Sequence, residues 1–284
     1  MFSYSNAGEA DLKSNHIMGL AARSSVLRQL YAACRQVPVL GSLLHRNVTR
    51  VLPPGRRIWL RIPRGQAKGL WIFVDPRFDP DYCNGQHEAW AQDLLRKHLK
   101  SGDCFYDVGA HIGFFSLIAA RIVGASGNVT AFEPDSRNAA VFRANCERNQ
   151  MSQITLMQAA VWRSSGKVSF ERAEPASSGM EGRVTEGAGT VREAVGVAGI
   201  SLDDYVFEQG SRPPSLVKID AEGGESAVLL GAQAVLDRYK PSLLCEIHDP
   251  EIGVELATFL TRFGYSVLDL PSVRKGYLWA ASNA

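Results

Sequence analysis

A short apolar strand that runs into a glycine turn, followed at once by an apolar helix, is the feature that most constrains this fold. Residues 105–116 read Phe-Tyr-Asp-Val-Gly-Ala-His-Ile-Gly-Phe-Phe-Ser. About a strand and a helix later, residues 129–134 form a second strand that ends on Glu133. A glycine turn after one strand and an acid after the next are typical of a nucleoside-binding site in a doubly wound α/β sheet. The sequence therefore predicts an α/β enzyme.

Strands and helices alternate from Cys104 onward. Strands are expected near residues 104–108, 128–133, 154–161, 216–220, 242–247, 265–270 and 276–281. Helices are expected near residues 112–123, 136–149, 224–238 and 251–263. This alternation predicts a Rossmann-like α/β fold with a seven-stranded, mostly parallel sheet and helices on both faces. The connection over residues 271–275 is too short for a parallel crossover, so the final strand should be antiparallel.

Residues 171–200 interrupt the alternation. They are rich in Gly, Ser, Glu and Ala and show little apolar periodicity. Two interpretations stay open, an insertion that covers the active site and a surface decoration.

The composition is that of a soluble globular protein. The 284 residues are 45% hydrophobic and 21% charged. No apolar run reaches the ~18 residues that a membrane span needs, and the first fifteen residues lack the pattern of a secretory signal. The five cysteines form no C-x-x-C pair, so neither a zinc site nor a disulfide framework is expected. A cytoplasmic location fits these features.

The N-terminal part is basic, and we expect it to form a separate extension. Residues 1–68 carry eleven Lys and Arg but only two acids, a surplus of nine positive charges. Residues 17–46 show helical periodicity with breaks near Pro38 and Gly41, and residues 58–62 and 70–74 look like a β-hairpin. The expected division is an extension over 1–82 and a catalytic domain over 83–284. The basic helix could touch a membrane surface or simply pack on its own domain.

The glycine spacing argues against a dinucleotide. Gly109 and Gly113 lie four residues apart, and nothing completes G-x-G-x-x-G. We expect Gly109 to let the backbone approach a ligand and Gly113 to begin the helix. Asp107 should accept from an ammonium group directly or through water, and Glu133 should bind both ribose hydroxyls. An amino acid joined to a nucleoside is S-adenosylmethionine, the predicted cofactor. A tight turn in some other α/β protein is the alternative.

A lysine lies inside a strand that should be buried. Alternate residues of a strand share a face, so Lys218, Asp220 and Glu222 should point the same way. Buried parallel strands are normally apolar throughout, and Lys218 therefore needs a partner such as Asp220. The pair is either a structural ion pair or a functional group at the carboxyl edge of the sheet, where ligands bind.

The next strand adds Glu246 and His248 to the same expected edge. Methyl transfer is an in-line displacement that requires alignment and removal of a hydroxyl proton. His248 is the predicted general base, with Asp220 or Glu222 orienting it or taking the proton instead. These side chains could also hold a divalent metal ion, as in catechol-type methyltransferases, although Lys218 would oppose a cation. Adenine should lie near Gln158, Ala159 and Ala160, with Phe132 or Trp162 as apolar walls.

Three segments together resemble the FkbM-type S-adenosylmethionine-dependent methyltransferases, over roughly residues 83–270. These segments are Gly85–Glu88, Asp107–Gly113 through Phe132–Asp135, and Leu216–Gly223 with Glu225. The resemblance implies a class I methyltransferase-type sheet and methylation of hydroxyls on sugars, glycans or natural products. It also implies that Pro134 contacts the cofactor and that Glu88 reaches the cofactor or the substrate, unless Glu88 is only a helix-start acid. This chain departs from the family pattern at His111, where Asn is typical, and at Ala221, where Val is typical.

Other functions fit less well. The strand over 216–220 lacks the N/D-P-P-Y end that is associated with methylation of adenine in nucleic acids, and no DNA-binding motif is visible. We therefore expect a small-molecule or glycan acceptor and no nucleic acid partner. A methyltransferase-like scaffold that binds partners without turnover remains the non-enzymatic alternative.

Overall fold

The computed structural model describes residues 56–77, 80–172, 182–185, 194–271 and 276–282. Arg57–Ala284 forms one compact unit. The predicted helix over 17–46 lies outside the described residues, as does any membrane contact that it makes. Within the described part, no helix combines the length and apolar character that a membrane span requires.

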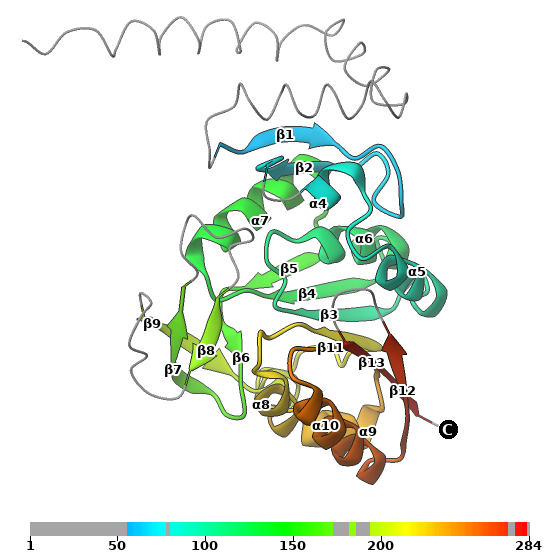
Figure 1. The fold of residues 1–284 in the computed structure, drawn as a ribbon, viewed down its shortest axis with the longest axis vertical. Coiled ribbons are helices and arrows are strands. Elements are labelled where there is room, and N and C mark those ends of the chain that lie inside the picture. The colour runs from blue at the N-terminus through cyan, green and yellow to red at the C-terminus, as the bar shows by residue number, and fades with distance from the viewer. Residues whose placement is uncertain (1–55, 78–79, 173–181, 186–193, 272–275, 283–284) are drawn as a thin grey trace, which may run out of the picture. The chain divides into compact units, whose positions relative to one another are not determined.

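A seven-stranded sheet forms the centre of the domain (Figure 1). In spatial order its strands are β12 (Tyr265–Pro271), β13 (Gly276–Ser282), β11 (Ser242–Ile247), β10 (Leu216–Ile219), β3 (Cys104–Val108), β4 (Asn128–Phe132) and β5 (Ile154–Met157). β13 is antiparallel to both of its neighbours, whereas the pairs from β11 to β5 are parallel. The predicted fold class, with its antiparallel final strand, is confirmed.

Helices cover both faces of this sheet, as predicted (Figure 1). One group comprises α5 (Ala89–His98), α6 (Phe114–Val123) and α7 (Ser136–Asn149), while the short α4 (Pro80–Asn84) lies beside the strand Trp71–Val74. The other comprises α8 (Glu225–Leu230), α9 (Gln233–Tyr239) and α10 (Pro250–Arg262), with a short π-helical turn, η1 (Asp204–Glu208), before β10. The apolar residues at alternate positions of β3, β10 and β11 pack with α8–α10 into the larger core.

Strand alternation decides which face each charged residue of the sheet occupies. Tyr106 and Val108 belong to the core beneath α8–α10. Asp107, between them, therefore faces the opposite side, where its carboxylate accepts a hydrogen bond from Ser116 of α6. Lys218 is the register partner of Asp107 in β10 and faces the same side, with its Nζ 5.0 Å from the ring centre of Phe115.

The hairpin of β1 (Ile58–Arg61) and β2 (Trp71–Val74) packs on α7, in the same compact unit as the sheet. Asn145 of α7 accepts from the Phe73 N–H at 2.7 Å and donates to the Ile112 carbonyl at 2.8 Å. Asn149 both accepts from and donates to the backbone of Trp71. These bonds attach the hairpin to the catalytic domain. The sequence had predicted the hairpin as part of an extension that ends at residue 82.

Residues 158–200 differ most from expectation. The single strand predicted over 154–161 is wrong, because β5 ends at Met157 and β6 (Ala160–Val161) enters a second sheet. In that sheet, β6 pairs with β9 (Ala194–Ile200), which pairs with β7 (Gly166–Glu171), and β7 pairs with β8 (Arg183–Thr185). The predicted insertion therefore contains ordered strands. The helix predicted over 224–238 is likewise two helices, because the chain turns at Gly231 against the Trp162 carbonyl.

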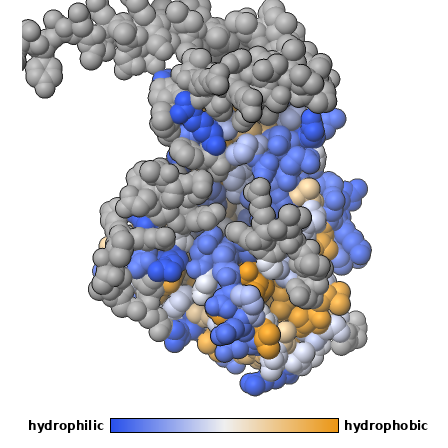
Figure 2. Space-filling view, in the orientation of Figure 1, coloured by the Kyte–Doolittle hydropathy of each residue, from blue (hydrophilic) through white to orange (hydrophobic). Residues whose placement is uncertain are grey.

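Apolar surface gathers toward the lower right of the domain in Figure 2, where Figure 1 draws α10 and β12. Val254 of α10 and Leu268 of β12 are among the large apolar side chains that are exposed. This surface lies on elements outside the loops that form the site described below.

Asn145→Ala tests how the hairpin is attached. The substitution removes the partners of the Phe73 N–H and the Ile112 carbonyl, and each unsatisfied buried group costs about 1–3 kcal/mol. We expect the free energy of unfolding, measured by urea denaturation, to fall by roughly 2–4 kcal/mol. Glu147→Ala, at an exposed position of the same helix, is the matched control and should change it by less than about 0.5 kcal/mol. An equal loss in both variants would contradict this role of Asn145.

Candidate active site

An open cleft lies at the carboxyl edge of the parallel strands, where ligands bind in such sheets. Its lining is Tyr82, His87, Glu88, Val108, Gly109, His111, Phe132, Glu133, Pro134, Asn138, Ala159, Ala160, Val161, Phe170, Gly182, Val184, Asp220, Ala221 and Glu222. The cleft thus brings together most of the predicted site residues, from four separate loops and from the strand that holds Ala160. Those that do not line it are Asp107, Gly113, Gln158 and His248.

The turn between β3 and α6 is left-handed at alternate residues, with φ of +76° at Gly109, +50° at His111 and +88° at Gly113. A Cβ atom on Gly109 would lie 1.8 Å from the carbonyl oxygen of Asp220. The close approach that requires glycine is therefore to the end of β10, whereas the sequence predicted an approach to a ligand. Gly113 precedes α6 as predicted, and a Cβ there would meet the ring of Phe142 at 2.7 Å.

His111 adopts a left-handed conformation that most side chains avoid. Asn, Asp and His are the non-glycine residues that tolerate it best. The departure from the family's Asn therefore preserves the shape of the turn. Burial, together with the nearby charges of His87 and Arg57, lowers the pKa of the His111 ring to about 4. The ring is consequently neutral at physiological pH, and it lines the cleft.

Glu133 lies where the sequence predicted, just after β4. Its two carboxylate oxygens accept from the backbone N–H groups of His111 and Asp135, each at 2.8 Å. The β3–α6 turn and the acid therefore hold each other in place. Burial raises the pKa of Glu133 to about 8, although these two N–H groups act against the shift.

Asp107 is buried behind the cleft. Its carboxylate accepts from the Ser116 hydroxyl at 2.5 Å. Burial raises its pKa, while the Lys218 charge and the Ser116 hydroxyl act in the opposite direction. The sequence predicted that Asp107 accepts from a ligand ammonium, and the structure places this carboxylate against α6 instead.

Lys218 and Asp220 form the ion pair that the sequence required. The Lys218 Nζ lies 2.9 Å from Asp220 Oδ2, and the lysine side chain is almost fully buried. Burial lowers the pKa of Lys218, but the carboxylates of Asp220 and Asp107 outweigh that effect and hold it above its ordinary value. Asp220 reaches from this pair to the cleft, because its backbone follows the end of β10.

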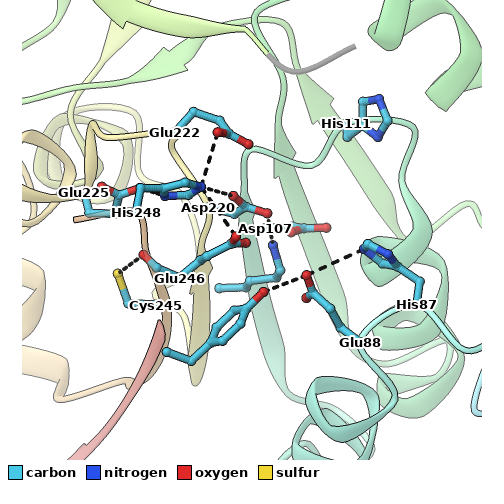
Figure 3. Close-up of polar contacts among 12 residues, drawn as sticks. His87, Glu88, Asp107, His111, Asp220, Glu222, Glu225, Cys245, Glu246 and His248 are labelled. Carbon is cyan, nitrogen blue, oxygen red and sulfur yellow. Dashed lines mark hydrogen bonds and ion pairs between the residues drawn. The ribbon is translucent and has the colours of Figure 1, made fainter. Parts of the chain in front are cut away.

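His248 lies among four carboxylates (Figure 3). β11 pairs directly with β10, as predicted, which brings Glu246 and His248 beside Asp220. The shortest contact joins His248 Nδ1 to Glu225 Oε1 at 2.8 Å. From Nε2 the distances are 3.2 Å to Glu222 Oε2, 3.4 Å to Glu246 Oε1 and 3.8 Å to Asp220 Oδ1. Burial lowers the His248 pKa, but the contacts with Glu222 and Glu225 outweigh it and raise the pKa to about 10.

The same carboxylates and imidazole raise the question of a divalent cation. One oxygen or nitrogen atom from each of Asp220, Glu246 and His248 lies within 4.8 Å of the others. However, the ammonium of Lys218 already binds Asp220. These side chains therefore fit a cluster whose negative charge is compensated by protein cations. They fit a divalent-cation site less well.

The opposite wall of the cleft contains residues that the sequence did not single out. The rings of His87 and Tyr82 contact each other in a tilted arrangement with their centres 4.0 Å apart, and both residues line the cleft. Glu88, which the resemblance suggested, lines it too and accepts from the Tyr277 hydroxyl at 2.6 Å. His87 lies within the segment Gly85–Glu88 and Tyr82 lies three residues before it, so position in or next to that segment was the available signal.

The second sheet supplies an apolar wall. Phe170 of β7 and Val184 of β8 line the cleft, as do Ala160 and Val161 of β6. Of the two apolar walls predicted for adenine, Phe132 lines the cleft and Trp162 does not, and the predicted Ala159 lines it as well. Gln158 points elsewhere, because its side chain accepts from Arg143 of α7 at 3.0 Å.

Asn138 is a further cleft residue that sequence reasoning missed. It lies in the first turn of α7, is almost fully buried, and has its Nδ2 3.5 Å from Glu133 Oε1. Its position five residues after Glu133 did not indicate a contact, because the two side chains approach each other only when the chain folds into α7.

Comparisons with known proteins point to one family. A family model described as the methyltransferase FkbM domain matches residues 107–267. The chain is 32% identical over 180 residues to the hexuronic acid methyltransferase AglP of Haloferax volcanii, covering 63% of this chain and 66% of that protein. It is 26% identical over 241 residues to the 31-O-demethyl-FK506 methyltransferase FkbM of Streptomyces tacrolimicus, covering 74% and 89% of the two chains.

A crystal structure of a methyltransferase FkbM from Methylobacillus flagellatus KT aligns with a TM-score of 0.46 and 16% identity. The alignment covers 73% of this chain and 55% of that one. The chain thus spans just under two thirds of the length of AglP and about half of the length of this solved protein.

Gly109→Ala tests the close approach of the two loops. The added methyl group would collide with the Asp220 carbonyl and would also strain a left-handed residue. We expect the free energy of unfolding to fall by about 3 kcal/mol or more, since overpacking and backbone strain add. Gly223→Ala is the matched control, because it is also left-handed but its Cβ would meet open space. It should cost only about 1–2 kcal/mol, and equal losses would show that the contact with Asp220 is unimportant.

Proposed function

The chain belongs to the FkbM methyltransferase family, and on this premise we propose that it is an S-adenosylmethionine-dependent O-methyltransferase. Its proposed acceptor is a hydroxyl group of a sugar, a glycan or a natural product. Two relatives support this class, since one is a hexuronic acid methyltransferase and the other is a 31-O-demethyl-FK506 methyltransferase. The acceptor of this chain is a proposal within that range.

The placement of Glu133 and Asp220 in one cleft, on either side of the Gly109 turn, is the observation that carries the proposal. The cleft suits S-adenosylmethionine at each of its three parts. Glu133 offers fixed carboxylate oxygens to ribose hydroxyls, and the wall of Ala160, Val161 and Phe170 offers an apolar surface to adenine. The turn at His111, with Glu88 across the cleft, is proposed to hold the methionyl end.

When bound, S-adenosylmethionine supplies a methyl group on a positively charged sulphur, and its transfer to an acceptor oxygen releases the hydroxyl proton. The protein must then align the acceptor and take up that proton. Asp220 and Glu222 line the cleft, and His248 contacts both of them. We propose that these three residues form the catalytic group, which also provides negative charge beside the cationic sulphur.

Calorimetric titration with S-adenosylmethionine tests the cofactor assignment. We expect saturable binding to the full chain, and Glu133→Ala should weaken it at least tenfold because the ribose hydroxyls lose their acceptor. Glu147→Ala, on the exposed side of α7, should leave the dissociation constant unchanged. Absence of binding to the unmodified protein would refute the proposal.

Binding should also depend on pH in a defined direction. The raised pKa of Glu133, about 8, means that much of the free protein holds this group protonated at pH 7. Ribose hydroxyls donate to the ionised form, so affinity should rise by up to roughly tenfold between pH 7 and pH 9. Glu133→Gln is the control, because the cofactor's own amine titrates in both proteins while Glu133 titrates in only one. An identical pH dependence in both would contradict the assignment.

Turnover is then measured with labelled S-adenosylmethionine and a set of neutral sugars, hexuronic acids and hydroxylated macrolides. Transfer to oxygen in one class would support the O-methyltransferase. Tight cofactor binding with no transfer to any class would favour the alternative of a methyltransferase-like scaffold.

A further inference from the structure

Both ring nitrogens of His248 face carboxylate oxygens. Nδ1 lies 2.8 Å from Glu225 Oε1, and Nε2 lies 3.2 Å from Glu222 Oε2. An ionised carboxylate can only accept hydrogen bonds, whereas a neutral imidazole carries a lone pair on one of its two nitrogens. A neutral ring would therefore turn a lone pair toward one of these carboxylates. A ring with a proton on each nitrogen places positive charge toward both carboxylates, as a hydrogen bond from Nδ1 to Glu225 and as an ion pair without hydrogen-bond geometry between Nε2 and Glu222.

The surroundings of His248 on every side favour this charged ring. Asp220 and Glu222 approach from the loop after β10, Glu225 from α8, and Glu246 from β11. Lys218 binds the other oxygen of Asp220. On the α10 side, the Asp249 carboxylate accepts from the backbone N–H of Glu251 at the start of that helix. The ring therefore sits among anions, and its raised pKa agrees with this geometry.

We propose that His248 is a permanent imidazolium ion that positions Glu222, and that Glu222, not His248, takes the proton from the acceptor hydroxyl. A ring that already carries two protons cannot accept a third, so it cannot be the general base. The proton passes from the acceptor oxygen to a Glu222 carboxylate oxygen. The assignment rests on the proposed function, which left the base open among three residues.

Glu222 is better placed for this task than the other carboxylates. Glu225 and Glu246 have side chains with no exposed surface. Asp220 lines the cleft, but its Oδ2 already binds the buried ammonium of Lys218 at 2.9 Å. Glu222 lines the cleft, keeps a quarter of its side chain exposed, and is held in a left-handed backbone conformation with φ of +49°.

The protonation state can be measured directly on the full chain, without cofactor or acceptor. Protein labelled with ¹³C and ¹⁵N at histidine is titrated by NMR, and His248→Gln identifies the resonance that disappears. We expect His248 to carry both protons at pH 7.5 and to lose one only near pH 10, while His111 stays neutral in the same spectra. A neutral His248 at pH 7.5 would overturn the proposal. So would a shift of its resonance when magnesium or zinc is added after chelator treatment, since a metal would then replace the proton.

Kinetics distinguish a positioning residue from a base. Glu222→Gln should lower kcat by 10²- to 10⁴-fold, the usual loss of general-base catalysis, which is much more than its effect on the dissociation constant of S-adenosylmethionine. His248→Gln should lower kcat as well. His248→Arg keeps a permanent positive charge, so its kcat should be at least tenfold higher than that of His248→Gln. Equal losses in the Gln and Arg variants, with turnover retained in Glu222→Gln, would make His248 the base. Cofactor binding by each variant tests the proposed function separately, and the NMR result stands even if His248→Arg fails to fold.

Discussion

The site depends on the close approach of two loops at the carboxyl edge of the sheet. The Gly109 and Ala110 N–H groups both donate to the Phe132 carbonyl at 3.0 Å, and the Asp220 N–H donates to the Val108 carbonyl at 3.1 Å. The ends of β3, β4 and β10 are therefore tied by their own backbones. The Asp220 carbonyl occupies the space that a side chain at position 109 would need. Glu133 on one side and the acidic residues on the other are thus fixed relative to each other before any ligand binds.

Charge balance is the second constraint on this edge. Burying an ion is costly unless a partner of opposite charge compensates it, and removing one partner leaves the other uncompensated. Asp107 and Asp220 flank Lys218 on one side of the cluster. On the other side, Glu222, Glu225 and Glu246 surround His248. The surrounding carboxylates therefore explain why a lysine occurs in a buried parallel strand, because its ammonium group compensates their charge.

Much of this arrangement could be predicted from the sequence, because it follows from the two-residue period of a strand and from which strands lie next to each other. Alternation along β3 and β10 identified the residues that share a face, and the adjacency of β10 and β11 brought His248 to Asp220. Orientation was harder to predict. Strand alternation does not say which face α6 covers, so Asp107 was expected at the ligand although Ser116 binds it. The second sheet was missed because its strands are short, rich in small residues, and paired across long stretches of chain.

The sequence by itself determined the element order, the glycine turn, the acid after the second strand and the group of charged residues at one edge. Local patterning suffices for these, since each depends on residues that are close in the chain. Only the tertiary structure decided the environment of each side chain. The loop after β10, α8 and the end of β11 must converge before the pKa of His248 rises, and a carbonyl from another strand must approach before Gly109 becomes indispensable. Electrostatic shifts and steric exclusion depend on distances between remote residues, which the folded chain alone sets.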